Sequence, residues 1–123
     1  MRILVIEDDA EVRGMICKML SDEDYDVIAA VNGKEGIELL RKESNVVLVI
    51  TDLIMPEKEG IEVIRELKQD FPPIKILAIS GRGCGSLQNY LTLSKALGAD
   101  LTLSKPFVKK ELLKVVKELL EHK

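Results

Sequence analysis

The sequence predicts an α/β fold, a five-stranded parallel sheet with helices on both faces. Short β-branched apolar runs alternate with longer segments whose apolar residues recur at helical spacing. This alternation occurs five times without a linker or low-complexity tract. Because each parallel connection needs a crossover, usually a helix, alternating elements favour a sheet covered by helices. The length of 123 residues suits one domain, so we expect a single domain over residues 1–123.

The five strands are expected where apolar runs are short enough to be buried on both faces. The sequences RILVI and VVLVI are the clearest examples, and the second is the most apolar. The expected strands are residues 2–6, 26–30, 46–50, 74–79 and 101–103.

A helix is expected after each strand. Asn32 with Glu35 three residues later resembles a capping box, which predicts a helix start there. The pair Pro72 and Pro73 ends the helix before the fourth strand. The expected helices run from about residue 9 to the polar turn at 21–26, then over 32–42, 57–69, 87–97 and 107–121.

Composition excludes several classes of function. The net charge of −3 and the lack of Trp argue against direct nucleic-acid binding. No apolar run approaches the roughly 20 residues of a membrane span. Cys17 and Cys84 lack metal-ligand spacing, so we expect a cytoplasmic, reducing location. The single histidine, His122, lies beside the C-terminus, which excludes serine–histidine and cysteine–histidine catalysis.

Functional groups are expected at one edge of the sheet. In open parallel sheets, ligands bind outside the carboxyl ends of the strands. The acidic turn at 22–26 precedes a strand and is therefore expected to be solvent-exposed surface. The residues that follow or end strands are Glu7, Asp8, Asp9, Thr51, Asp52, Ser80, Ser104 and Lys105.

These groups together predict a site for a phosphoryl group. Clustered carboxylates repel one another and favour a hard divalent cation such as Mg²⁺. A lysine and a serine can contact phosphoryl oxygens, and an aspartate can act as the nucleophile. Each group has a simpler interpretation. Asp9 can equally be a helix N-terminal residue favoured by the dipole, Lys105 a surface lysine and Ser80 a turn residue.

The motifs also resemble a known family. In order, RILVIEDD, VITDLIMPEKEG, ILAIS and SKPF closely resemble the receiver domain of bacterial two-component response regulators, including the chemotaxis regulators. The resemblance covers essentially the whole chain. It implies a flavodoxin-like fold of five βα units with strand order 2-1-3-4-5.

The resemblance assigns a role to each matching residue. Asp52 would be the phosphoacceptor that attacks a phosphohistidine on a sensor histidine kinase or phosphotransfer protein. Ser80 and Lys105 would contact the bound phosphoryl group, and Lys105–Pro106 would be a cis peptide bond. The Mg²⁺ ligands would be Glu7, Asp8, Asp52 and the backbone carbonyl of Ile54.

The implied function is a phosphorylation-dependent switch. The chain would be no enzyme beyond catalysing its own phosphorylation and dephosphorylation. Segments 87–97, 101–103 and 107–121 would form the face that binds an unidentified downstream protein. The resemblance implies a monomer or a phosphorylation-linked dimer, with no contact to membranes.

Three features depart from the family or vary within it. Thr102 occupies the position of an aromatic residue that usually transmits the signal. The loop at 80–86 is unusually rich in glycine and contains Cys84, which we interpret as an incidental thiol. The apolar Ile54 would shield the acyl phosphate from water, which predicts a long-lived phosphoryl group.

Three alternatives remain open. A degenerate receiver would bind proteins without being phosphorylated. A phosphatase of the haloacid dehalogenase type would need an aspartate two residues after the nucleophile, where this chain has Ile54. An FMN-binding protein would need a phosphate loop after the first strand, where EDD would repel phosphate.

Overall fold

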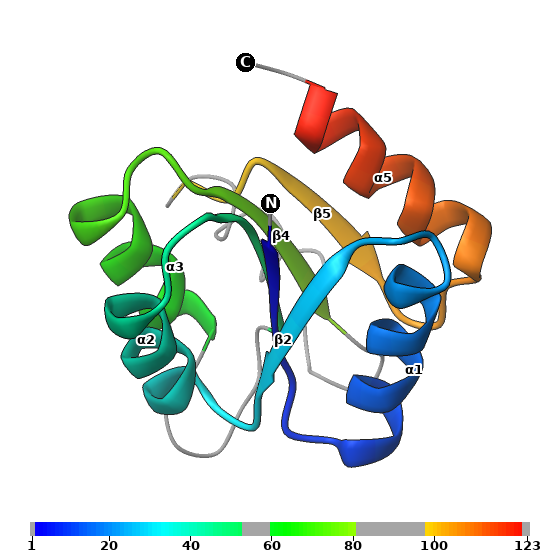
Figure 1. Ribbon diagram of the computed structural model, residues 1–123, viewed down its shortest axis with the longest axis horizontal. Helices are drawn as coiled ribbons and strands as arrows, with labels where there is room; N and C mark the ends of the chain where they lie inside the picture. Colours follow the sequence, from blue (N-terminus) through cyan, green and yellow to red (C-terminus); the bar gives the residue numbers. More distant parts are fainter. Residues whose placement is uncertain (1, 53–59, 81–97, 122–123) are drawn as a thin grey trace.

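The computed structural model is a five-stranded parallel sheet in the order β2-β1-β3-β4-β5, as predicted (Figure 1). It describes residues 2–52, 60–80 and 98–121. The strands are β1 (Arg2–Ile6), β2 (Asp26–Ala30), β3 (Val46–Asp52), β4 (Lys75–Ser80) and β5 (Leu101–Ser104). The helices within the described residues are α1 (Ala10–Ser21), α2 (Gly33–Lys42), α3 (Gly60–Asp70) and α5 (Lys109–Glu121). The helix predicted at 87–97 lies outside the described residues.

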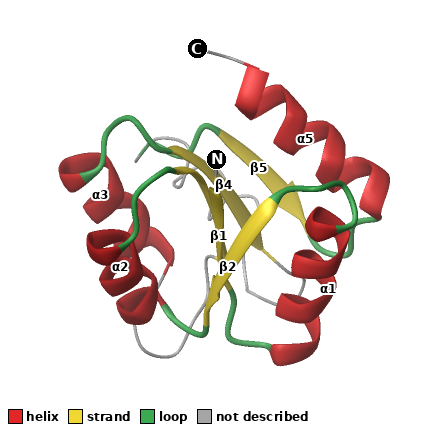
Figure 2. Cartoon of the chain, viewed as in Figure 1, coloured by secondary structure: helices red, strands yellow, loops and turns green. Residues whose placement is uncertain are grey.

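The helices form two layers, one on each face of the sheet. Helices α2 and α3 cover one face, and α1 and α5 cover the other (Figure 2). Successive strand residues point to opposite faces, so each strand contributes to both layers. Along β1, Leu4 and Ile6 join the core under α2 and α3, whereas Ile3 and Val5 join the core under α1 and α5. Burial of both faces explains the continuous apolar runs of the sequence.

Several strand and helix ends differ from the predicted positions by one or two residues, most of all the end of β3 and the start of α5. Strand β3 continues two residues beyond 50, because Thr51 and Asp52 pair with Ala78 and Ile79 of β4. Helix α5 begins at Lys109 rather than at 107. At its start, the amide of Val108 donates to the carboxylate of Glu111, which reaches back as in a capping box.

Helices α1 and α2 begin with side-chain caps. The Asp9 carboxylate accepts hydrogen bonds from the amides of Glu11 and Val12, at 2.9 and 3.2 Å. The side chain of Asn32 accepts from the amide of Glu35, whose carboxylate accepts from the amide of Val31. The N-cap predicted at Asn32 is therefore present, but the reciprocal bond of a capping box is shifted by one residue, because Glu35 accepts from the amide of Val31 instead of that of Asn32.

Helix α2 lies very close to β1 at Gly36. A Cβ atom at this position would come within 2.8 Å of Cγ1 of Ile6, which is too close for a carbon–carbon contact. Glycine therefore permits α2 to pack against the end of β1, directly before Glu7.

The edge of the sheet opposite the carboxyl ends of the strands carries ion pairs that are exposed or half-buried. The acidic turn before β2 is exposed at its acidic residues, as predicted, and Asp22 lies near both Lys18 and Lys109. Arg2 pairs with Asp26 and Glu43. None of the helices in the described ranges has the length and apolar character needed to cross a membrane.

Candidate functional site

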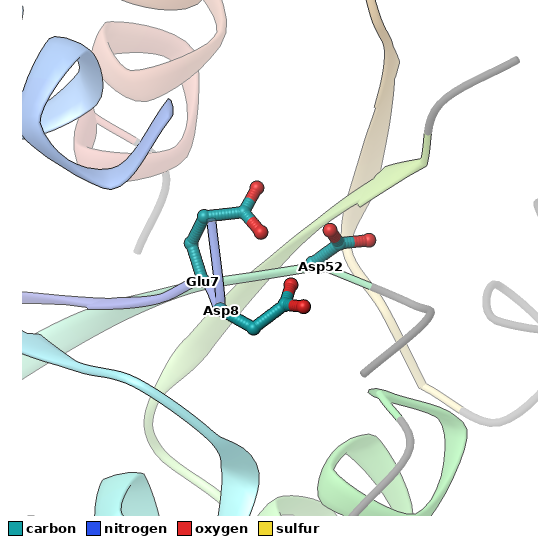
Figure 3. Close-up of side chains that lie close together, drawn as sticks. All are labelled: Glu7, Asp8 and Asp52. Carbon is teal, nitrogen blue, oxygen red and sulfur yellow. The ribbon is translucent and has the colours of Figure 1, made fainter. Parts of the chain in front are cut away.

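Three carboxylates gather at the carboxyl edge of the sheet. Glu7 directly follows β1 and Asp52 ends β3, and these strands are neighbours because Ile6 pairs with Thr51. Asp8 follows Glu7 and points toward the same region (Figure 3). One oxygen atom from each of the three carboxylates lies within 4.8 Å of the others. The expected meeting of Glu7, Asp8 and Asp52 therefore occurs.

Burial distinguishes the three acids. Glu7 is 2% exposed and Asp52 is 8% exposed, whereas Asp8 is exposed to solvent. Removing a carboxylate from water is costly unless a partner compensates for the lost hydration. Glu7 and Asp52 therefore require a cation close by, and Asp8 lies where the site opens to solvent.

Lys105 supplies one such cation. Its Nζ atom lies 2.6 Å from Oε1 of Glu7 and 2.9 Å from Oδ2 of Asp52. Lys105 follows β5, which is separated from β3 by β4, so its side chain extends past the end of β4. The peptide bond between Lys105 and Pro106 is cis, as the sequence motif implied.

The buried charges alter each other's protonation. Burial raises the pKa of Glu7, and the neighbouring Asp52 raises it further, while the hydrogen bond from Lys105 opposes the change. Burial lowers the pKa of Lys105, but its hydrogen bonds to Glu7 and Asp52 outweigh this and raise the pKa overall. Lys105 is therefore held in its charged form, and the site favours additional positive charge.

The three carboxylates fit a divalent cation. Two Mg²⁺ ligands on opposite sides of the ion are about 4.2 Å apart, twice the usual metal–oxygen distance. The spacing of 4.8 Å or less is close to this value, so small side-chain rotations suffice. Lys105 contacts one oxygen of Glu7 and one of Asp52, and a carboxylate can accept several contacts at once. Oxygen donors with a net negative charge suit Mg²⁺ rather than a softer metal.

The structure settles the role of Asp9 and adds a residue that sequence reasoning missed. Asp9 caps α1, which favours the helix N-terminal interpretation.

Nη1 of Arg13 donates to the backbone carbonyl of Glu7 at 2.8 Å and lies 3.4 Å from that of Asp8. The position of Arg13, four residues after the capping Asp9, could have indicated this contact. Side chains in a helix lean toward its N-terminus, which brings the Arg13 side chain toward the residues before the cap.

Several predicted features lie outside the described residues. These are Ile54, the side chain of Ser80, the glycine-rich loop with Cys84, and the segment 87–97. Thr102 lies in β5, where it pairs with Ala78, so the departure from the family pattern is located within the sheet. Cys17 is half-buried against the core under α1 and α5, and burial raises the pKa of its thiol, as expected for a packing residue.

The sequence matches the protein-family model of the response regulator receiver domain over residues 3–117. The chain belongs to this family. The match covers β2 to β5, β1 from Ile3 onward and the residues of the acidic cluster. The family is that of two-component signalling, as the sequence motifs had indicated.

Relatives show the same unit in different contexts. The chain is 33% identical to the transcriptional regulatory protein CpxR of Klebsiella pneumoniae, over 97% of this chain and 49% of that protein. It is also 33% identical to the sensor kinase CckA of Brucella abortus, over 97% of this chain and 12% of that protein. The chain thus spans about half the length, or less, of these curated relatives.

A solved structure agrees with the fold. The chain superimposes on a CheY-like response regulator receiver domain protein from Methanospirillum hungatei with a TM-score of 0.88. The two chains are 30% identical, and the match covers 98% of this chain and 93% of the other. The flavodoxin-like arrangement predicted from the resemblance is therefore confirmed.

Proposed function

We propose that this receiver domain is a phosphorylation-controlled switch in which Asp52 accepts a phosphoryl group. The observation that carries the proposal is the meeting of Glu7, Asp8, Asp52 and Lys105 at the carboxyl edge of the sheet. We further propose that residues 1–123 act as one domain and that the site requires Mg²⁺.

Asp52 is the nucleophile in this proposal. Its carboxylate oxygen forms a bond to phosphorus while the bond from phosphorus to the donor nitrogen of a phosphohistidine breaks. The donor keeps that electron pair, and the product is an acyl phosphate on Asp52. The phosphohistidine would belong to a sensor histidine kinase or a phosphotransfer protein.

The surrounding residues prepare Asp52 for this reaction. Glu7, Asp8 and Asp52 would hold Mg²⁺, with the backbone carbonyl of Ile54 as a further ligand. When bound, the ion supplies positive charge that offsets the charge developing on the phosphoryl oxygens. Lys105, 2.9 Å from Oδ2 of Asp52, is positioned to contact a phosphoryl oxygen. Ser80, which ends the neighbouring strand β4, would provide a hydroxyl contact.

Phosphorylation would change which contacts are favourable at this edge. The new group adds about −1.5 to −2 charge and strong acceptor oxygens. Lys105 would then exchange part of its contact with Glu7 for the phosphoryl group, a difference that biases two conformations of the domain. The response would reach β5 and α5, where we propose that a downstream protein binds.

The test is phosphorylation by a small acyl-phosphate donor. The protein is incubated with acetyl phosphate and Mg²⁺, and its intact mass is recorded. We expect one base-labile phosphoryl adduct on the wild type and none on Asp52→Asn or on samples treated with a chelator. Asp24→Asn is the matched control, because Asp24 is exposed, lies in the acidic turn and has a positive φ that asparagine also adopts.

Each result has a clear meaning. An adduct on both the wild type and Asp24→Asn, but not on Asp52→Asn, supports the proposal. No adduct on the wild type, with the donor active on another receiver domain, contradicts it. In that case the chain is a degenerate receiver that binds partners without phosphorylation.

A further inference from the structure

Arg13 joins helix α1 to the loop that carries two of the clustered acids. Its Nη1 atom donates to the carbonyl oxygen of Glu7 at 2.8 Å and lies 3.4 Å from the carbonyl oxygen of Asp8. Arg13 itself sits in the first turn of α1, where its amide donates to the carbonyl of Asp9. The guanidinium therefore links α1 to the backbone of the two residues that precede the capping residue Asp9.

The Glu7 carbonyl lies just beyond the residues of β1 that pair with the neighbouring strands. Ile6 is the last residue of β1 that pairs with both neighbouring strands, and Glu7 lies one position beyond it. The amide of Glu7 still donates to Ala30, at 3.1 Å. Its carbonyl belongs to the peptide unit that joins Glu7 to Asp8. The orientation of this peptide unit determines how the two side chains lie relative to each other.

Arg13 holds this peptide unit in one orientation. A hydrogen bond from a charged donor is stronger than a neutral one, and the guanidinium has a fixed planar geometry. The cap formed by Asp9 fixes the next residue along the chain. Together these contacts leave the backbone of the loop between β1 and α1 little freedom to change the positions from which the two carboxylates extend.

We infer that Arg13 is a positioning residue for the cation site, acting through the backbone of Glu7 and Asp8. The inference rests on the proposed function, because it assumes that these acids bind Mg²⁺. Arg13 would not touch the ion. Instead it would keep the ligand loop ordered before the ion arrives, so that binding does not have to order it.

The charge of Arg13 and its hydrogen bonds predict opposite results. A positive charge near the acids repels Mg²⁺, so its removal alone would strengthen binding. Loss of the hydrogen bonds frees the loop and would weaken binding. The sign of the change in Mg²⁺ affinity therefore distinguishes a positioning role from a purely electrostatic one.

The experiment compares Mg²⁺ binding by variants of the unphosphorylated protein, using isothermal titration calorimetry. Arg13→Met removes the donors and keeps the length of the side chain. We expect its dissociation constant for Mg²⁺ to rise about tenfold, a typical effect of losing a residue that orients metal ligands. Arg13→Lys keeps the charge and one donor group, and should recover part of the loss. Lys18→Met, an exposed cation on the same helix, should match the wild type.

A second measurement follows the loop without metal. Amide hydrogen exchange at residues 7–9 should become faster in Arg13→Met and remain unchanged in Lys18→Met. Urea unfolding confirms that the variants are folded. Should Arg13→Met not fold, Arg13→Lys carries the comparison, because it retains the charge but has lost the planar donor.

The outcomes separate this inference from the proposed function. Unchanged or tighter Mg²⁺ binding by Arg13→Met, with normal binding by the wild type, overturns the role of Arg13 alone. A wild type that binds no Mg²⁺ overturns the proposed cation site as well. Weaker binding by Arg13→Met, with partial recovery in Arg13→Lys, supports the inference.

Discussion

Two lysines four positions apart each face two carboxylates, in very different surroundings. Nζ of Lys105 lies 2.6 and 2.9 Å from Glu7 and Asp52, whose side chains are 3% and 10% exposed. Nζ of Lys109 lies 3.8 Å from Asp22 and from Glu23, whose side chains are 45% and 49% exposed. The same chemical groups are thus buried at the carboxyl edge of the sheet and hydrated at the other.

The comparison distinguishes ion pairs that affect the stability of the fold from ion pairs that contribute little to it. Exposed pairs are screened by water and salt and contribute little to stability. The carboxyl edge is different, because the solvent-exposed Asp8 adds a third carboxylate to the two buried ones that Lys105 contacts. A buried, unbalanced charge destabilises a fold, and such arrangements are concentrated at functional sites.

The largest expected effect comes from removing the buried lysine. Lys105→Met should lower the free energy of unfolding by about 3 kcal/mol, because Glu7 and Asp52 remain buried without a cation. Lys109→Met should lower it by less than about 1 kcal/mol. Urea unfolding at neutral pH, without divalent ions, measures both values. Equal losses in the two variants would show that burial does not decide the outcome.

A steric change behind Glu7 tests whether packing, rather than charge, dominates at this edge. Gly36→Ala should lower the unfolding free energy by about 2 kcal/mol, because the added methyl group meets Ile6. Gly14→Ala is the control: nothing lies near its Cβ position, so we expect a gain of about 0.5–1 kcal/mol from reduced backbone freedom. Both effects should be independent of salt. A neutral Gly36→Ala would mean that α2 can shift away from β1.

Adding Mg²⁺ should offset the excess negative charge at the carboxyl edge and so stabilise the folded protein. At ten times its dissociation constant, the ion should raise the unfolding free energy by about 1.4 kcal/mol, since it binds the folded form. The stabilisation should disappear with a chelator and be absent in Asp8→Asn. Asp24→Asn should retain it. Thermal unfolding with and without Mg²⁺ provides the measurement, and equal stabilisation of both variants would argue against a cation at the acidic cluster.

Ionic strength should produce the smallest effect. Raising it from about 0.05 to about 0.5 M shortens the screening length to a few ångströms and should abolish the small loss caused by Lys109→Met. Most of the loss caused by Lys105→Met should remain, because its partners are buried. Repeating the urea experiment at both salt concentrations provides the comparison. A similar salt dependence for the two lysines would contradict it.

Much of the site could be predicted because parallel strands end at a common edge. The periodicity of the apolar residues located β1 and β3, and the shared edge then placed Glu7 and Asp52 on the same side of the sheet. The sequence could not reveal that Lys105 contacts both acids. Its side chain has four rotatable bonds and extends past β4, so its final position depends on the assembled charges.

Other features depend on local competition that sequence patterns do not resolve. Asp9 could have joined the acidic cluster or capped α1, and the structure shows the cap. Arg13 has the spacing of an ordinary helical surface residue, and its contacts with the Glu7 and Asp8 carbonyls follow from the path of the preceding loop. Strand β3 ends at Asp52 rather than at 50 because the pairing with β4 continues through Ile79.

The ion pair between Lys105 and Glu7 joins positions 98 residues apart. Because synthesis proceeds from the N-terminus, a growing chain presents both Glu7 and Asp52 before Lys105 emerges from the ribosome. Glu7 and Asp52 therefore gain their contacts with Lys105 only after β5 has joined the sheet. A molecule that ends before β5 lacks this ammonium, so the group of Glu7, Asp52 and Lys105 is complete only when all five strands have assembled.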